Sequence, residues 1–181
     1  KNVLEVGTGV GLTSIYAAKL GAKKVVATDI EPLAVEYTQK NAKAAGVGGA
    51  VEARLVPRQS PGAFSAVKPE EKFDVILANL PYVLDLEAPA AGVPTNDNGA
   101  LITSLIDGLQ AHLAPGGRAI LLYRTFFTQQ FAARYARMKG YAVRLHATDR
   151  ISQSEINVMY KLFSKTLLEK RGIDPKQIDM Q

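Results

Sequence analysis

The amino-acid sequence predicts an α/β protein in which helices pack on both faces of a mostly parallel β-sheet. Short apolar runs rich in β-branched residues alternate with amphipathic segments of about ten to fifteen residues, which is the pattern of repeated βαβ units. Glycine or proline marks the ends of most of these segments. The chain has 181 residues, 47% hydrophobic and 22% charged, which fits a single globular domain and excludes a wholly disordered or coiled-coil protein.

Five short apolar runs are predicted to form the parallel strands: residues 3–6, 24–28, 50–55, 73–78 and 118–123. Two later runs, residues 141–147 and 156–163, are close enough in sequence to pair antiparallel at a sheet edge. We therefore expect a Rossmann-like, doubly wound sheet of these seven strands, mostly parallel, with an antiparallel edge strand.

The helices predicted between the strands are Leu12 to Gly21, Pro32 to about Gly46, residues 99–113 and residues 128–139. A turn, Pro115-Gly116-Gly117, is expected before the fifth strand. The aromatic residues expected in the core are Tyr16, Phe73, Phe131 and Phe163. The irregular stretch of residues 83–98 has the length of loops that often act as functional lids.

Residues 1–163 are expected to form one domain, and residues 164–181 a C-terminal helix and polar tail. Only Lys1 and Asn2 precede the first predicted strand, so we expect a segment upstream of it to be missing. The chain has no cysteine, which excludes a disulfide framework and a thiolate metal site. No apolar run approaches the ~20 residues of a membrane-spanning helix, and no cluster of His, Asp and Glu has metal-ligand spacing. These features favour a soluble, cytoplasmic protein that needs no metal.

The net charge of +5 is unevenly distributed. Residues 118–181 hold 12 Lys and Arg against 5 Asp and Glu, whereas residues 1–117 hold 10 against 12. An excess of +7 in the C-terminal third can mark a surface for nucleic acid or another acidic partner, although such charge runs more often form a solvated face.

A glycine loop follows the first predicted strand. Gly7, Gly9 and Gly11 allow positive φ angles and a close approach of the backbone to a ligand, and the helix that follows points its first amides towards the same place. The second strand ends at Asp29, where an acid can accept hydrogen bonds from both ribose hydroxyls of a nucleoside. Together these residues predict a nucleoside pocket at the carboxyl edge of the sheet.

The spacing of the glycines indicates which kind of nucleoside the pocket binds. Dinucleotide sites use G-x-G-x-x-G, but Leu12 stands where the last glycine of that pattern is required. The acid before the loop, Glu5, suits a cationic ligand better than a phosphate. S-adenosylmethionine carries a sulfonium and an ammonium group, so it fits better than NAD.

The tetrapeptide Asn79-Leu80-Pro81-Tyr82 follows the fourth predicted strand, again at the carboxyl edge. The Asn79 side-chain oxygen and the Leu80 carbonyl could accept the two N–H bonds of a planar NH₂ group while Tyr82 stacks on its plane. Those contacts would aim the nitrogen at a methyl donor, so that catalysis would be mainly positioning. The alternative is a plain turn at the end of a strand.

Over nearly its whole length the chain resembles the class I S-adenosylmethionine-dependent methyltransferases. It is most similar to the branch with an Asn-Pro-Pro-Tyr signature, which includes release-factor glutamine N5-methyltransferases and ribosomal RNA guanine N2-methyltransferases. Residues 1–163 would then be the methyltransferase domain. The resemblance implies that S-adenosylmethionine is bound by Glu5, Gly7, Thr8, Gly9, Gly11, Asp29, Ile30, Gln59 and Asn79. It implies that Asn79, Leu80, Pro81 and Tyr82 act on the substrate.

The chain departs from that branch at two places. Leu80 replaces the first proline of the signature, and Asn-Leu-Pro-Tyr is found in RNA adenine dimethyltransferases, which differ at Thr8 and Asp29. The family commonly has an acid after the third strand to hold the adenine amine, whereas this chain has Arg58, Gln59 and Ser60 there.

The predicted function is transfer of a methyl group to a planar nitrogen of a macromolecule, either a protein glutamine amide or an exocyclic amine of an RNA base. Two alternatives stay open: a non-catalytic module that binds the cofactor, and an NAD-dependent oxidoreductase, which the glycine spacing disfavours. The expected partner is the macromolecular substrate, protein or RNA; no membrane is expected, and the sequence does not indicate the oligomeric state.

Overall fold

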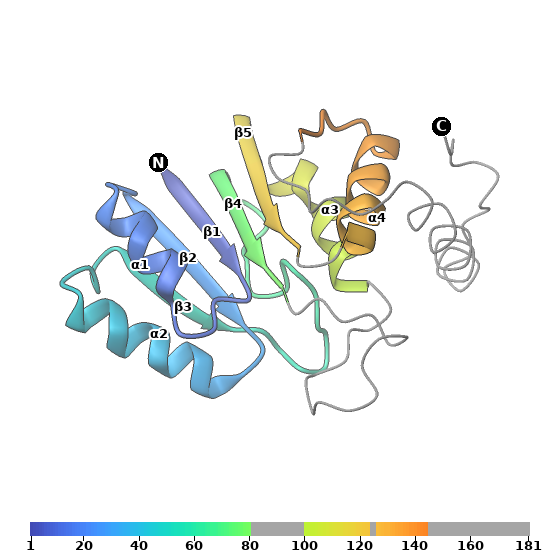
Figure 1. The fold of residues 1–181 in the computed structure, drawn as a ribbon. Coiled ribbons are helices and arrows are strands. Elements are labelled where there is room, and N and C mark those ends of the chain that lie inside the picture. Colours follow the sequence, from blue (N-terminus) through green and yellow to red (C-terminus); the bar gives the residue numbers. More distant parts are fainter. Residues whose placement is uncertain (81–99, 124–125, 145–181) are drawn as a thin grey trace. The chain divides into compact units, whose positions relative to one another are not determined.

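The computed structural model describes residues 1–80, 100–123 and 126–144 (Figure 1). The chain divides into two compact units. The first consists of Lys1–Pro81 and Ala100–Leu122, and the second of Tyr82–Gly99 and Tyr123–Gln181. The first unit holds the sheet and three helices, while the described part of the second holds one helix, α4 (Phe126–Met138).

The first unit is built on a parallel sheet. Its strands are β1 (Asn2–Val6), β2 (Lys24–Asp29), β3 (Val51–Leu55), β4 (Phe73–Asn79) and β5 (Leu113–Leu122), in the spatial order β3-β2-β1-β4-β5. All four pairings are parallel. The order reverses between β1 and β4, which makes this the switch point where open α/β sheets bind their ligands. The prediction of an α/β Rossmann-like fold is confirmed.

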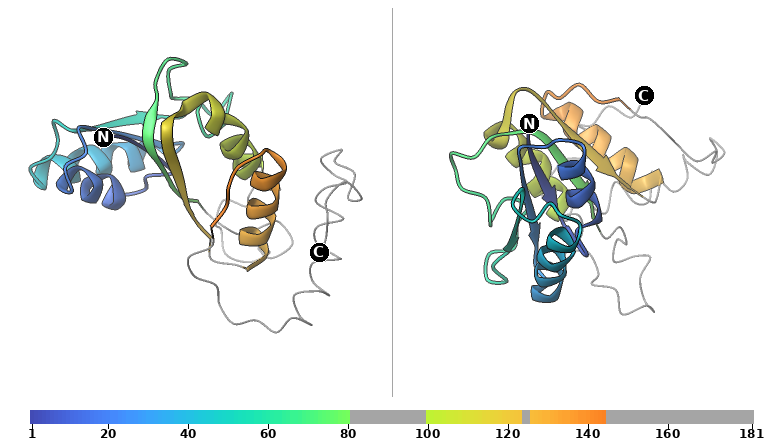
Figure 2. Two further views of the ribbon diagram at one scale, coloured as in Figure 1. Left: turned by 90° about the horizontal axis from the view of Figure 1, so that it is seen from above. Right: turned by 90° about the vertical axis from the view of Figure 1, so that its left-hand side faces the viewer.

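Helices cover both faces of this sheet (Figures 1 and 2). On one face lie α1 (Leu12–Lys19) and α2 (Pro32–Ala44), and on the other lies α3 (Ala100–His112). Val3, Val25 and Val51 project from three neighbouring strands into one buried cluster with residues of α1 and α2. Leu4 and Val26, the next residues along β1 and β2, are also fully buried and lie on the opposite face of the sheet, because side chains alternate along a strand. Burial on both faces is what the near-continuous apolar strands of the sequence require.

The prediction of seven strands with an antiparallel edge is wrong for the part that can be tested. Residues 141–144, where the sixth strand was expected to begin, form no strand, while residues 145–147 and 156–163 lie outside the described residues. Tyr141 instead donates its backbone N–H to the Ala136 carbonyl, and Gly140 donates to Arg137, with Gly140 at a φ of 85°. These bonds terminate α4 in a Schellman motif, so the start of the expected strand serves as a helix cap.

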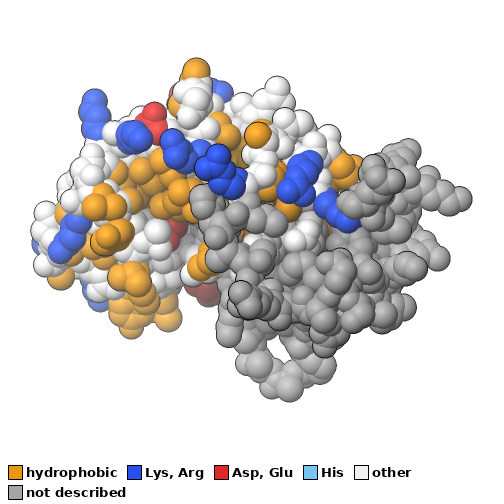
Figure 3. Space-filling model, turned by 45° about the horizontal axis from the view of Figure 1, so that its top comes forward, with side chains coloured by type: hydrophobic (Ala, Val, Ile, Leu, Met, Phe, Trp, Pro, Cys, Tyr) orange, Lys and Arg blue, Asp and Glu red, His pale blue; other side chains and the backbone are white. Residues whose placement is uncertain are grey.

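The predicted core position of Tyr16, in α1, is also wrong. Tyr16 is 62% exposed and Leu12 is 74% exposed, so neither belongs to the core. Figure 3 shows that hydrophobic side chains lie at several places on the face of the molecule that it draws. The positions of α1 that pack inward carry Ser14, Ile15 and Ala18, of which Ser14 and Ala18 are small. Small side chains let α1 lie close to the sheet, directly after the glycine loop. The core placement of Phe73 and Phe131 is confirmed, and Phe163 lies outside the described residues.

The expected turn Pro115-Gly116-Gly117 lies inside β5 as an irregularity rather than before it. The register of β5 against β4 shifts between Phe73 and Val75. A Cβ on Gly117 would lie 2.9 Å from the Phe73 carbonyl oxygen, closer than real Cβ atoms come. A glycine is therefore needed where β5 bulges against β4.

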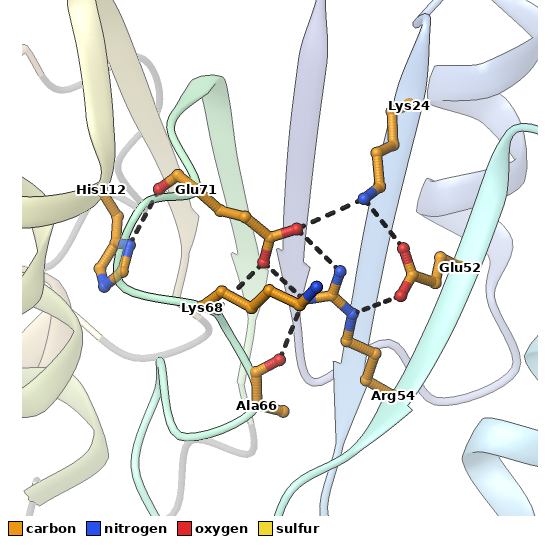
Figure 4. A network of polar contacts seen from close by, with 7 residues as sticks. All are labelled: Lys24, Glu52, Arg54, Ala66, Lys68, Glu71 and His112. Carbon is orange, nitrogen blue, oxygen red and sulfur yellow. Dashed lines mark hydrogen bonds and ion pairs between the residues drawn. The ribbon is translucent and has the colours of Figure 1, made fainter.

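A network of charged side chains holds the segment between β3 and β4 against the sheet (Figure 4). The Arg54 guanidinium lies 2.6 and 2.8 Å from the two carboxylate oxygens of Glu71 and 2.8 Å from Glu52. Lys24 lies 2.9 Å from Glu52 and 3.3 Å from Glu71. Hydrogen bonds from Arg54 are the largest cause that lowers the pKa of each glutamate, Glu52 and Glu71, to about 2.

Candidate cofactor site

Three segments expected to bind the cofactor or substrate leave the sheet at one edge. The glycine loop follows β1, Asp29 is the last residue of β2, and Asn79 is the last residue of β4. Because these strands are parallel and adjacent in the order β2-β1-β4, their carboxyl ends meet at the switch point, with the glycine loop in the middle. The sequence prediction of where these residues lie is confirmed.

The glycine loop is tightly bent and pinned to the sheet. Gly7, Gly9 and Gly11 have φ angles of 74°, 56° and 84°. The backbone N–H groups of Gly7 and Thr8 both donate to the Thr28 carbonyl, at 2.9 and 3.0 Å. A Cβ on Gly9 would meet nothing within 4 Å, so the tip of the loop leaves space for a ligand.

Glu5 lies beneath this loop and is 3% exposed. Its Oε2 accepts hydrogen bonds from the Ser14 backbone N–H and the Thr8 hydroxyl, both at 2.9 Å, and from the Ser14 hydroxyl. Burial raises the pKa of Glu5, and the hydrogen bonds from Ser14 and Thr8 oppose that rise. Glu5 satisfies a first-turn N–H of α1, whose N-cap, Gly11, has no side chain to do so. Glu5 and Thr8 therefore support the loop from within the protein.

Asp29 faces the loop from the end of β2. Its Oδ2 accepts a hydrogen bond from the Gly9 N–H at 2.8 Å, and its Oδ1 accepts one from the Glu31 N–H at 3.0 Å. The residue is half-buried, as is Ile30. Each carboxylate oxygen can accept a further bond, so the group can still receive two ribose hydroxyls.

Helix α2 also holds the loop, through two side-chain hydrogen bonds. Thr38 donates its hydroxyl to the Gly9 carbonyl at 3.1 Å, and Asn41 donates its amide to the Val10 carbonyl at 2.8 Å. Sequence analysis assigned neither residue to the site. The available signal was their spacing, because polar residues three apart lie on the same side of a helix.

The segment after β3 approaches from the other side of β2. The Val56 N–H donates to the Asp29 carbonyl at 2.7 Å, which fixes where the segment starts. Gln59 is exposed, and the neighbouring Arg58 lies 2.7 Å from the carboxylate of Glu31. The predicted contact of Gln59 with adenine remains a prediction.

At the end of β4, Asn79 is exposed and Leu80 is 2% exposed. A Cβ on Gly7 would lie 3.2 Å from Leu80 Cδ2, so Leu80 packs directly against the glycine loop. Pro81, Tyr82 and the expected lid, residues 83–98, lie outside the described residues. Of the tetrapeptide, Leu80 therefore contacts the glycine loop, and Asn79 precedes it at the end of β4.

Among the residues that the structure describes, no helix is long and apolar enough to cross a membrane. In the same part of the chain, no three His, Cys, Asp or Glu residues are placed to hold a metal ion.

Several known proteins are similar to this chain. A "putative protein N5-glutamine methyltransferase" of Methanocaldococcus jannaschii is 31% identical over 166 residues, which cover 88% of this chain and 80% of that protein. The ribosomal protein L11 methyltransferase of Rhizobium etli is 34% identical over 121 residues, 67% of this chain and 35% of that protein. The structure of the ribosomal protein L11 methylase of Lactobacillus delbrueckii subsp. bulgaricus aligns with a TM-score of 0.62 at 24% identity, covering 82% of this chain and 64% of that one.

The fold and the sequence similarity define the chain as a class I S-adenosylmethionine-dependent methyltransferase. Within that class it belongs to the ribosomal protein L11 methyltransferase (PrmA) family, whose sequence profile matches residues 1–121. The chain spans about a third of the length of the Rhizobium etli L11 methyltransferase. Membership of a methyltransferase family argues against the alternative of an NAD-dependent oxidoreductase. The spacing of the glycines had already disfavoured that alternative.

Proposed function

We propose that the chain binds S-adenosylmethionine across the switch point and methylates a nitrogen of a protein substrate. The observation that carries the proposal is the placement of Asp29 against Gly9, with its carboxylate half-exposed at the tip of the loop. An open loop tip and an acid beside it fit a nucleoside whose other end is cationic.

The order of the strands indicates in which direction the cofactor would lie across their carboxyl ends. The ribose binds at Asp29 at the end of β2, and the methyl group must reach Asn79 at the end of β4. The methionine part therefore crosses the glycine loop after β1, and the adenine extends the opposite way, past Ile30 towards Gln59 after β3. Gly7, Gly9 and Gly11 let the ligand pass close to the backbone.

When bound, the cofactor supplies a methyl group made electrophilic by the sulfonium. The Asn79 side-chain oxygen and the Leu80 carbonyl would accept the two N–H bonds of the substrate and so position its nitrogen. In the overall reaction the nitrogen gains a C–N bond as the S–C bond of the sulfonium breaks, which leaves S-adenosylhomocysteine, and one N–H proton is released to water. From their residue types, Tyr82 would stack on the planar group and Pro81 would restrict the preceding residue. Holding the two reactants in this geometry is the main contribution that the protein makes to the rate.

A protein nitrogen is the substrate that the comparisons favour. The relatives named above include an L11 methyltransferase and a protein whose name gives glutamine N5 as its target. The signature Asn79-Leu80-Pro81-Tyr82 suits a glutamine amide, as in the Asn-Pro-Pro-Tyr branch. An exocyclic amine of an RNA base is the second candidate, because residues 118–181 carry an excess of +7 that phosphates would neutralise.

Replacing Asp29 with alanine is expected to weaken S-adenosylmethionine binding by about 1 to 3 kcal/mol, because a buried ribose hydroxyl loses its charged acceptor. Titration calorimetry with the purified chain measures this change. The matched control is Glu36→Ala, which removes an exposed acid of α2 that pairs with Lys40 and should leave affinity unchanged. Absence of binding by the folded wild-type chain at millimolar cofactor would refute the proposed site.

The substrate class is tested by transfer of tritium from labelled S-adenosylmethionine into a cell extract. Label that is lost on protease digestion and survives nuclease digestion is the expected result. The reverse pattern would assign the RNA amine. Label that survives both treatments and migrates as a small molecule would exclude a macromolecular substrate of either kind.

A further inference from the structure

The peptide groups of Gly9 are bound on both sides by side chains from different elements. The N–H of Gly9 donates to Asp29 at the end of β2, and its carbonyl accepts from the Thr38 hydroxyl of α2, at 2.8 and 3.1 Å. The tip of the glycine loop is thus fixed between the acid proposed to bind ribose and the middle of the second helix.

The Thr38 side chain is buried and, among the residues that the structure describes, has few alternative hydrogen-bond partners. It is 0% exposed, and the hydroxyl of Thr8 lies 3.4 Å from its hydroxyl. Because Thr8 donates its one proton to Glu5 at 2.9 Å, the proton of Thr38 is available for the Gly9 carbonyl. The hydroxyl of Thr38 therefore makes a directional contact with the loop from a fixed position.

The packing around Thr38 makes this contact specific. A Cβ on Gly11 would lie 2.9 Å from the Thr38 methyl group, so that methyl group is already packed against the loop backbone. The hydroxyl fixes Gly9 while the methyl group sits against Gly11. One α2 side chain thus touches both ends of the stretch that turns from the loop into α1.

We propose that Thr38 is a positioning residue of the cofactor site, which acts through Gly9 on the carboxylate of Asp29 without touching the cofactor. This inference rests on the proposed site for S-adenosylmethionine. When Thr38 holds the Gly9 carbonyl, the Gly9 N–H points at Asp29 and keeps that carboxylate in one orientation for the ribose. Without the hydroxyl, the Gly9–Val10 peptide group loses a restraint, so the φ and ψ angles of Gly9 can change and shift the Thr8–Gly9 peptide group, whose N–H orients Asp29.

The test compares two substitutions that distinguish the hydrogen bond of the Thr38 hydroxyl from the packing of its methyl group. Thr38→Val keeps the branched shape and removes the donor, whereas Thr38→Ser keeps the donor and removes the methyl group. We expect Thr38→Val to raise the Kd for S-adenosylmethionine about five- to tenfold, the effect of one lost hydrogen bond, and Thr38→Ser to bind close to the wild type. If Thr38→Val does not fold, Thr38→Ala takes its place.

A double-mutant cycle with Asp29→Ala tests whether Thr38 affects cofactor binding through Asp29. If Thr38 acts through Asp29, Thr38→Val should weaken binding less than about twofold when Asp29 is already alanine, because interacting residues are not additive. Full additivity of the two changes would overturn the proposal. So would a Thr38→Val variant that melts at a lower temperature and binds the cofactor with wild-type affinity.

A measurement without cofactor keeps this inference separate from the proposed function. We expect the Gly9 amide of Thr38→Val to exchange its hydrogen about fivefold faster than in the wild type or in Thr38→Ser. If the wild type does not bind S-adenosylmethionine, the proposed function fails while this measurement still decides whether Thr38 orders Gly9. Unchanged exchange at Gly9 in Thr38→Val would refute the role of Thr38.

Discussion

Replacing Gly11 with alanine is expected to lower the free energy of unfolding by roughly 3 kcal/mol or more and to abolish cofactor binding at micromolar concentrations. Gly11 has a φ of 84°, which costs an alanine about 1 to 2 kcal/mol. A Cβ there would also lie 2.9 Å from the methyl group of Thr38 and 3.0 Å from its Cα atom. Shortening the Thr38 side chain cannot relieve the second contact, so α1 and α2 must move apart.

Gly21→Ala is the matched control for this prediction. Gly21 follows the C-cap of α1 at a φ of 88°, yet a Cβ there would meet nothing within 4 Å. Its replacement should therefore cost only the strain of the backbone, about 1 to 2 kcal/mol. Denaturant unfolding of both variants measures the difference. Equal losses would show that α2 does not need to approach Gly11 closely.

The parts of the site that follow local patterns were predictable from the sequence. The glycine loop, Asp29 and Asn79 each come directly after an apolar run, and parallel strands bring their carboxyl ends together whatever the rest of the chain does. The same logic placed β1 to β4 within one or two residues of their observed bounds. Periodicity and glycine punctuation suffice for such features because both act over a few residues.

The features that were missed depend on contacts between residues far apart in sequence. Thr38 reaches Gly9 across 29 residues, and although its spacing from Asn41 puts both on one side of α2, that spacing does not show what this side of the helix faces. The exposed face of α1 was misjudged because Tyr16 has the spacing of a core residue, while the close approach of the helix to the sheet selects small side chains inside. The strand expected from Tyr141 was lost to a helix cap at Gly140, since the same short segment satisfied either pattern.

The second large effect is expected at Glu71. Glu71→Gln should lower the free energy of unfolding by roughly 1 to 3 kcal/mol at pH 7, because it leaves the more exposed Glu52 as the carboxylate partner of the largely buried Arg54 guanidinium, beside the neutral Ala66 carbonyl. The side chains of Arg54 and Glu71 are 13% and 16% exposed, so water compensates little of this loss. Glu70→Gln is the matched control, as it changes the adjacent exposed acid, and it should leave stability nearly unchanged.

The lowered pKa of Glu71 also determines how the stability of the fold should depend on pH. The pKa of Glu71 is about 2 in the folded chain and 4.5 as the ordinary value, so its stabilising effect is complete above pH 4.5 and is lost as pH falls towards 2. Glu5 has the opposite sign: its pKa is raised by burial, so its carboxylate disfavours the folded state as pH rises above 4.5. Unfolding measured from pH 7 to pH 2 should therefore show a shallower loss of stability below pH 4.5 in Glu71→Gln than in the wild type. Parallel curves for the two proteins would mean that Arg54 does not stabilise the charged form of Glu71, and that packing alone holds the segment between β3 and β4.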